Sequence, residues 1–337
     1  MTRSTAAPLR IAIAGASSLL GREITELISS SALPPHELRL LDDVALEGVL
    51  TEAGGEPGVI HGLGADSFEG AGVVFLAGLR EFAARHWADA QRAGAAVVDL
   101  SGGLAGVRGA AVSIPSLDEK LGALRAPPTN AFRSPGAAAI VAATLSVGLR
   151  ELPVRRLAAT FLQSVSESGQ AGIDELESQT ASLLSFQPIG REVFDTQVAF
   201  NLVERYGEAC RERMEDVRAL VARDISDYLG YRAPMPAIQV VQAPVFYGAA
   251  FSVYVEFEAT FPQQVVEESL RLVGVGAGAD SPSNVSAAGS TEISVTVRSD
   301  ANLPMSTWIW GVVDNVRLAA HNAVRIAENV AAATRKP

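Results

Sequence analysis

The first regular pattern in the chain is a short apolar run, followed by a turn between two glycines and a longer stretch with helical spacing. Residues 11–14 are all apolar, as in a strand buried on both faces of a parallel sheet. A helix with one buried face is predicted by apolar residues at mostly three- and four-residue steps, namely Leu20, Ile24, Leu27 and Ile28. Because glycine lets the backbone approach a pyrophosphate and a helix N-terminus offers free N–H groups, this unit is typical of a dinucleotide-binding fold.

The turn between this strand and helix departs from a three-glycine loop. Gly15 and Gly21 are present, but Ser17 and Ser18 stand where the middle glycine would be. The turn is therefore a candidate cofactor contact, and it also fits the strand–turn–helix of any α/β domain.

Two acids follow the second predicted strand, residues 37–41, and bear on which cofactor would bind. An acid at this strand tip hydrogen-bonds a free 2′-hydroxyl of the adenosine ribose and repels a 2′-phosphate. Asp42 and Asp43 thus favour NAD if a dinucleotide binds at all. The alternative is a solvated turn that happens to carry two acids.

Further apolar runs continue the alternation of strands and helices. Buried strands are expected at residues 73–76 and 96–100, with a helix at residues 80–93 between them. This spacing predicts a parallel sheet with right-handed crossovers. Three prolines make residues 126–135 a predicted loop, and residues 136–149 are a predicted helix of small residues.

The pattern changes after Pro153, where longer strands replace the short buried runs. The predicted strands are residues 156–165, 238–243, 249–258 and 293–298. The predicted helical regions are residues 166–185, 204–229 and 308–333, and residues 274–289, rich in Gly, Ala and Ser, are predicted as a mobile loop. Residues 251–258 alternate apolar and polar side chains, as in an antiparallel sheet.

These elements predict an α/β fold with a Rossmann-like parallel sheet and a second α+β domain whose sheet is mostly antiparallel. The expected divisions are residues 1–133 for the dinucleotide-binding domain, 134–307 for the α+β domain and 308–337 for a C-terminal helix that returns to the first domain.

The composition narrows the classes of function. A net charge of −11 argues against nucleic acid and against anionic membrane surfaces. The single cysteine, Cys210, rules out an intrachain disulfide, and with four histidines it makes no zinc site of the usual kind, so no metal is expected. No signal-peptide pattern and no run of ~20 apolar residues is found. We expect a soluble cytoplasmic protein.

Six stretches, in their order and spacing, resemble the aspartate-semialdehyde dehydrogenase family over nearly the whole chain. They are GASSLLGREI, VVFLAGL, VVDLSGG, FLQSVSESGQAGIDEL, QAPVFYGAAFSVYVEFE and VVDNVRLAAHNAVRIAENV. The resemblance implies an N-terminal NADP-binding domain and a C-terminal domain that dimerises and holds substrate. It also implies reduction of aspartyl phosphate through a cysteine thioester, which needs a thiolate, a base and cations for phosphate and carboxylate.

The family's nucleophile lies in an Asn-Pro-Asn-Cys type of motif at the start of a helix. When the prolines are aligned, Ala137 falls at the cysteine, and a shift of one residue gives Gly136. Ser134 offers a hydroxyl nearby, but no base is paired with it in the sequence. Cys210 lies far along the chain, in the predicted helical region, and reads as an ordinary helix cysteine.

The family's other functional positions are mostly replaced as well. The base histidine falls at Ala249, the carboxylate-binding arginine at Gln242 and the phosphate-binding arginine at Ala105. The substrate lysine falls near Glu215 in a loose alignment, whereas Gln163 matches the glutamine beside the thioester.

The chain therefore resembles the catalytically silent paralogues of this family. Gly78 is kept in the cofactor region, but Ser18 replaces the middle glycine, so we expect weak or no NADP binding, with NAD favoured over NADP. The expected partner is a second copy in a homodimer, or an active relative in a heteromer. A substrate-type pocket would be formed by Ser134, Gln163 and Gln242.

Two alternatives stay open from the sequence. The first is an active NAD(P)-dependent oxidoreductase that acts on an aldehyde or acyl substrate through Ser134, Gln163 or Tyr247. The second is a sensor that binds a dinucleotide without turning it over.

Overall fold

A computed structural model describes residues 8–53, 56–64, 66–118, 120, 129–278 and 280–334. The chain forms two compact units. The first unit comprises Met1–Pro115, Arg125–Ser134 and Ala319–Pro337, and the second comprises Ser116–Leu124 and Pro135–Leu318.

The first unit is built on a seven-stranded sheet in which neighbouring strands run parallel, in the order β5-β2-β1-β6-β7-β9-β8. Its strands are β1 (Leu9–Ala14), β2 (His36–Asp42), β5 (His61–Gly62), β6 (Val73–Leu76), β7 (Ala96–Asp99), β8 (Ala111–Val112) and β9 (Ala131–Arg133). The central strands β1, β6 and β7 consist mainly of fully buried residues, which explains their unbroken apolar runs.

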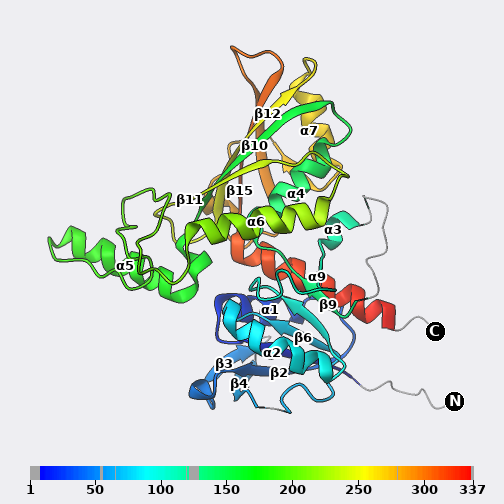
Figure 1. Ribbon diagram of the computed structural model, residues 1–337, viewed down its shortest axis with the longest axis vertical. Coiled ribbons are helices and arrows are strands. Elements are labelled where there is room, and N and C mark those ends of the chain that lie inside the picture. Colours follow the sequence, from blue (N-terminus) through cyan, green and yellow to red (C-terminus); the bar gives the residue numbers. More distant parts are fainter. Residues whose placement is uncertain are drawn as a thin grey trace. The chain divides into compact units, whose positions relative to one another are not determined.

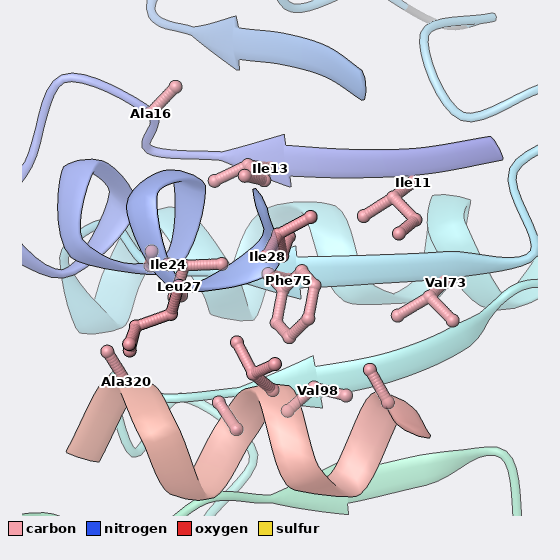
Figure 2. Packing of buried hydrophobic residues seen from close by; sticks show 14 of the residues in the cluster. Ile11, Ile13, Ala16, Ile24, Leu27, Ile28, Val73, Phe75, Val98 and Ala320 are labelled. Atoms are coloured by element: carbon pink, nitrogen blue, oxygen red, sulfur yellow. The ribbon is translucent and has the colours of Figure 1, made fainter. Parts of the chain in front are cut away.

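Helices cover both faces of this sheet. One face packs against α1 (Leu19–Ser29) and against α9 (Asn315–Thr334) from Ala319 onward. Figure 2 shows this core, where side chains of β1, β6 and β7 meet Ile24, Leu27 and Ile28 of α1 and Ala320 of α9. The other face packs against α2 (Arg80–Arg92) through Phe82, Ala83 and Ala90.

The second unit contains a six-stranded sheet in the order β11-β10-β12-β15-β14-β13 (Figure 1). Its strands are β10 (Val154–Gln163), β11 (Ala237–Gln242), β12 (Ala249–Phe257), β13 (Val275–Ala277), β14 (Ile293–Ser299) and β15 (Ser306–Val313). The pairs β10–β12, β12–β15 and β14–β15 are antiparallel, whereas β10–β11 and β13–β14 are parallel. The predicted fold class, a parallel α/β sheet followed by an α+β domain with a mostly antiparallel sheet, is confirmed.

Three helices of the second unit pack together and against strands of this sheet: α4 (Ala137–Leu149), α6 (Met214–Leu229) and α7 (Gln263–Arg271). The remaining elements are η1 (Val44–Leu46), β3 (Leu50–Ala53), β4 (Glu56–Val59), α3 (Pro115–Asp118), η2 (Val165–Ser168), α5 (Gly169–Leu184) and α8 (Asn284–Ala287). Within the described residues, no helix is long and apolar enough to cross a membrane.

The predicted helix at residues 308–333 is wrong in its first part. Trp308–Val313 belong to β15, and α9 begins only at Asn315. The Asp314 carboxylate accepts the backbone N–H of Arg317 at 3.0 Å, which caps the new helix and marks its start. Val312 belongs to β15 and Val316 to α9. Because they are four residues apart, the spacing expected within one helix, they were wrongly predicted to lie on one helical face.

Other predicted elements also need correction. Residues 204–213, placed in a helix, are irregular, and α6 begins only at Met214. The predicted loop at residues 274–289 contains β13 and α8, and the predicted proline loop contains β9. Strands β9 and β13 are three residues long each, and their partners β7 and β14 are not adjacent to them in the sequence.

Candidate functional site

The glycine turn of the first unit is held by backbone packing. Gly15 has a φ of +87°, and a Cβ added there would lie 2.3 Å from the backbone nitrogen of Gly78. A Cβ on Gly21 would lie 2.3 Å from the carbonyl oxygen of Gly15. The turn after β1 therefore touches both the turn after β6 and the first turn of α1. These contacts within the chain require glycine at Gly15 and Gly21 whether or not a cofactor binds.

We expect Gly15→Ala to lower the free energy of unfolding by about 3 kcal/mol, because the new Cβ would meet backbone atoms that have little room to move. Gly94 has a similar φ of +83°, but nothing lies within 4 Å of an added Cβ there. Gly94→Ala therefore measures only the cost of a side chain on left-handed backbone, and we expect it to lower the free energy of unfolding by about 1 kcal/mol. Chemical denaturation compares the two variants, and equal losses would show that the contact with Gly78 relaxes.

The two serines of the turn are engaged within the chain. The Ser18 hydroxyl accepts the N–H of Gly21 at 2.9 Å and donates to the carbonyl of Ala77 at 2.8 Å, so it caps α1 and joins the two turns. The N–H of Ser17 donates to the Asp42 carboxylate at 2.9 Å. Negative charge therefore lies directly against the loop that would receive a pyrophosphate.

Asp42 and Asp43 have different surroundings. Asp42 is buried and accepts the N–H groups of both Ser17 and Asp43, each at 2.9 Å. Asp43 is exposed and caps η1 by accepting the N–H of Ala45 at 3.2 Å. The Asp42 carboxylate is bonded to two backbone N–H groups, and its negative charge would repel a phosphate placed beside it.

In the second unit, Gln163 and Gln242 lie side by side as register partners of β10 and β11. The Gln163 side-chain amide donates to the Gln242 side-chain oxygen at 3.2 Å and to the Tyr206 hydroxyl at 3.1 Å. Tyr206 donates in turn to the same Gln242 oxygen at 2.8 Å. Burial raises the pKa of Tyr206 well above its ordinary value, so the hydroxyl stays protonated.

This Gln163–Tyr206–Gln242 network uses the full hydrogen-bonding capacity of Gln242. Its amide nitrogen donates to the carbonyls of Gln163 at 3.0 Å and Ala243 at 2.9 Å, while its oxygen accepts two bonds. The side chain is completely buried. An amide offers two donors and two lone pairs, so nothing is left over for a substrate carboxylate.

The positions matched to the nucleophile and base carry methyl groups at the starts of two elements. Ala137 is the first residue of α4 and Ala249 the first of β12, and both are buried. Neither side chain can attack an acyl carbon or move a proton.

Asn315, which was not among the predicted site residues, forms a buried polar junction. Its side-chain oxygen accepts the N–H of Gly248 at 2.9 Å, and its amide donates to Ser166 at 3.0 Å and Glu167 at 2.9 Å. It thereby joins the start of α9 to the residue before Ala249 and to the turn after β10. The signal was present in the stretches VVDNV and SVSES, where polar residues interrupt apolar runs.

Ser134 is engaged within the first unit. It is buried, and its hydroxyl accepts from the Asn322 side chain at 2.9 Å and donates to the Ala319 carbonyl at 3.4 Å. Both partners lie in α9, so the hydroxyl ties β9 to that helix. Tyr247 is 49% exposed in the loop between β11 and β12.

Cys210 lies in the loop before α6, which corrects its predicted placement in a helix. Its thiol donates to the carbonyls of Val193 at 3.1 Å and Glu212 at 3.0 Å, and burial raises its pKa. These contacts favour the neutral thiol, the less nucleophilic form.

The other aligned positions are peripheral. Ala105 lies in a turn after β7, and Glu215 forms exposed ion pairs with Arg213 and Arg218 at 3.7 Å each. The described residues contain no cluster of three or more His, Cys, Asp or Glu side chains that could hold a metal. A cavity of about 800 Å³ lies along β2 and the β3–β4 hairpin, and its lining includes none of the predicted site residues.

Comparison with known proteins gives a consistent result. A family model described as "Semialdehyde dehydrogenase, dimerisation domain" matches residues 148–318. The chain is 31% identical over 329 residues to a Pseudomonas aeruginosa protein named "USG-1 protein homolog", covering 95% of this chain and 97% of that protein. It is 28% identical over 329 residues to Vibrio cholerae aspartate-semialdehyde dehydrogenase 2, covering 94% and 96%.

Solved structures agree with these sequence matches. The structure of a probable aspartate-semialdehyde dehydrogenase from Pseudomonas aeruginosa superposes with a TM-score of 0.85 at 30% identity, covering 96% of this chain and 98% of the other. The Candida albicans enzyme, solved with NADP, superposes with a TM-score of 0.65 at 15% identity, covering 96% and 100%, and shows likeness of fold alone.

Proposed function

We propose that this chain, which belongs to the semialdehyde dehydrogenase family, is a catalytically silent member that keeps the fold and lacks the thioester chemistry. Its relatives named aspartate-semialdehyde dehydrogenase place its lineage in amino-acid biosynthesis. Its role would be binding or regulation as a dimer, with the first unit as the dinucleotide-type domain and the second as the dimerisation domain.

The Gln163–Tyr206–Gln242 network is the observation that carries this proposal. A site that still bound an anionic substrate would keep a cation or open donors where the family has its carboxylate-binding arginine. All hydrogen-bond donors and acceptors of the Gln242 side chain are instead bonded to groups of the same unit. The proposal is also supported by Ala137 and Ala249, because alanine provides neither a nucleophile nor a base at the positions aligned with these groups. An assay of nucleotide reduction with aspartate semialdehyde and phosphate tests the proposal, because turnover would contradict it.

The hydrogen bonds of Ser134 and Gln163 argue against the alternative of relocated catalysis. Both side chains are buried and engaged with neighbours in their own unit. A dinucleotide sensor would need the glycine turn to bind its ligand despite the Asp42 carboxylate beside it.

We expect NADP at about 1 mM to move the melting temperature by less than about 1 °C, because a ligand raises stability only when its concentration exceeds Kd. NAD is expected to give the larger shift, since it lacks the 2′-phosphate that Asp42 repels. Asp42→Asn removes this charge, so the melting-temperature shifts caused by NAD and by NADP are expected to become more similar. A rise of several degrees with NADP on the unaltered protein would contradict weak binding.

The homodimer is proposed on the open face of the six-stranded sheet. On β12, Phe251, Val253 and Val255 are buried, so Ser252 and Tyr254 point to the other face. Tyr254 lies across from Trp308, with ring centroids 5.1 Å apart, and Trp308 is 43% exposed. Aromatic residues gathered on one sheet face are typical of interfaces. An active relative on this face is the alternative, and a homodimer in solution would argue against it.

A further inference from the structure

The seven-stranded sheet of the first unit has an open edge along β2. Strand β5 pairs with β2 only at Leu41 and Asp42, so within the described residues no strand lies beside residues 36–40 on that side. Five residues of a strand extend for about 17 Å. An unpaired edge of this length is a template on which another chain can form backbone hydrogen bonds.

The backbone groups that point out from this edge follow from the bonds on either side of β2. The Pro35 carbonyl accepts from Leu9 of β1 at 2.9 Å, and the Asp42 carbonyl accepts from the residue after β5, also at 2.9 Å. Successive residues of a strand in a parallel sheet direct their N–H and C=O groups to opposite sides. Odd-numbered residues of β2 therefore face β1, whereas His36 and Leu38 direct their N–H and C=O groups to the open edge.

The cavity of about 800 Å³ follows this open edge. Its lining includes Leu38 from one face of β2 and Glu37 and Arg39 from the other, so the cavity runs along the edge of the sheet and not over a single face. Residues 57–59 of β4 and side chains of α1 also line it. The volume lies within the range of sites that bind ligands.

The side of the edge toward α1 is apolar. Leu38 packs against the core that α1 shares with the sheet. Because β3 contacts α1, the β3–β4 hairpin lies on this same side of the edge, and its Pro57 and Val59 line the cavity. Val59 is 44% exposed, so apolar surface is open to a partner here.

The opposite side of the edge is cationic. Arg10 forms an ion pair with Glu37 at 3.4 Å. Within the described part of the chain, Arg39 is bonded only to backbone carbonyls, those of Ser67 at 2.6 Å and Glu69 at 3.5 Å. Two arginines and one glutamate give the lining a net positive charge, although the whole chain carries −11. Because a guanidinium binds a carboxylate more strongly than a neutral oxygen, this side favours an acidic ligand.

We propose that the open edge of β2 binds an extended segment of another protein in which acidic and apolar residues alternate. Added as a strand, this segment pairs with the outward N–H and C=O groups of His36 and Leu38. Its successive side chains point alternately to the two sides of the edge, so acidic ones meet Arg39 and apolar ones meet Leu38 and Val59. Neither the glycine turn nor the predicted substrate-type pocket takes part, so the site would stand even if the chain proved to be an active enzyme.

The probe is a labelled hexapeptide of alternating valine and glutamate, titrated with the full chain and followed by fluorescence anisotropy. It is expected to bind at least about tenfold more tightly than the same peptide with lysine in place of glutamate. The net charge of −11 favours the lysine peptide at long range, so a preference for glutamate has to come from the edge itself.

Arg39→Gln is expected to raise the dissociation constant of the glutamate peptide about tenfold, because it removes a charged donor. Arg85→Gln is the matched control and should leave the dissociation constant unchanged. Arg85 is exposed on α2, does not line the cavity, and also donates to a backbone carbonyl, that of Glu81 at 3.2 Å. If Arg39→Gln melts lower than the unaltered chain, the peptide variants below still decide, because they use the unaltered chain.

Methylation of alternate peptide nitrogens tests whether the peptide binds as a strand. In an added strand, all residues whose N–H groups face β2 carry their side chains on one side, so they are either the valines or the glutamates. We therefore expect methylation of one set to weaken binding at least about a hundredfold and methylation of the other set to change it little. Loss of the valine set would indicate an antiparallel strand, and loss of the glutamate set a parallel one.

Three results would overturn the proposal. The first is no binding of the glutamate peptide at about 1 mM, and the second is equal binding of the lysine peptide. The third is an equal effect of the two methylated sets. If citrate then displaced the peptide, the cavity would be a site for a small anion, and if peptide affinity fell as the protein concentration rose, a second copy of the chain would occupy the edge.

Discussion

Purified protein mixed with aspartate semialdehyde, phosphate and NADP⁺ or NAD⁺ is expected to reduce no nucleotide above the protein-free rate. Removing the nucleophile of a covalent mechanism typically costs on the order of 10⁶ in turnover. The resemblance to the family further implies that Ala249 stands at the base position and Gln242 at the carboxylate-binding position, and neither side chain can take over those roles. Absorbance at the reduced-nucleotide band measures the rate, and Vibrio cholerae aspartate-semialdehyde dehydrogenase 2 serves as the positive control.

Restoring the thiol alone is not expected to restore turnover. Ala137→Cys places a thiol on the first residue of α4, where the helix N-terminus favours the thiolate. Ala137→Cys/Ala249→His adds a base. Both variants still lack an open carboxylate-binding position, because Gln242 stays closed by Tyr206 and Gln163. Turnover by the unaltered chain would overturn the proposed loss of chemistry, and turnover by the double variant would show that the closed network is no obstacle.

The fold could be predicted for those elements whose own residues show a clear pattern of apolar positions. Strand β6 was predicted with its exact bounds because four apolar residues stand between turns, and α2 was predicted within one residue because its buried positions repeat at helical spacing. Strands β9 and β13 are three residues long and were missed, because their stability comes from partners such as β7 and β14 that the local pattern does not reveal.

The candidate site likewise has parts that the local sequence predicted and parts that it did not. Ser134, Gln163 and Gln242 were predicted to form one substrate-type pocket. Gln163 and Gln242 lie together as register partners on β10 and β11, whereas Ser134 belongs to the first unit. Tyr206, which closes their network, was missed because it comes from an irregular loop. For Gly15 and Gly21, the sequence alone does not distinguish a glycine required by a cofactor from one required by packing. The structure shows that Gly15 packs against Gly78 and Gly21 against Gly15.

Gln242→Arg, which introduces the arginine that the resemblance to the family implies at this position, is expected to lower the free energy of unfolding by about 4 kcal/mol. The reason is that it places a charge at a completely buried position without a carboxylate partner. The substitution also removes the oxygen that accepts from Tyr206 and Gln163. Chemical denaturation followed by tryptophan fluorescence measures the loss. Two of the three tryptophans, Trp308 and Trp310, lie in β15 of the same sheet, so the signal reports mainly on this unit.

Gln264→Arg is the matched control, because Gln264 is exposed on α7 and the same change there should stay within about 0.5 kcal/mol. If Gln242→Arg were as stable as the unaltered protein, its neighbours would have to accommodate a guanidinium, and the site would be open rather than closed. Succinate would then be the probe, since a dicarboxylate that raised the melting temperature of this variant alone would show a recovered carboxylate site. We expect no such rise, because position 242 is completely buried in the unaltered protein, where a dicarboxylate in solution cannot reach it.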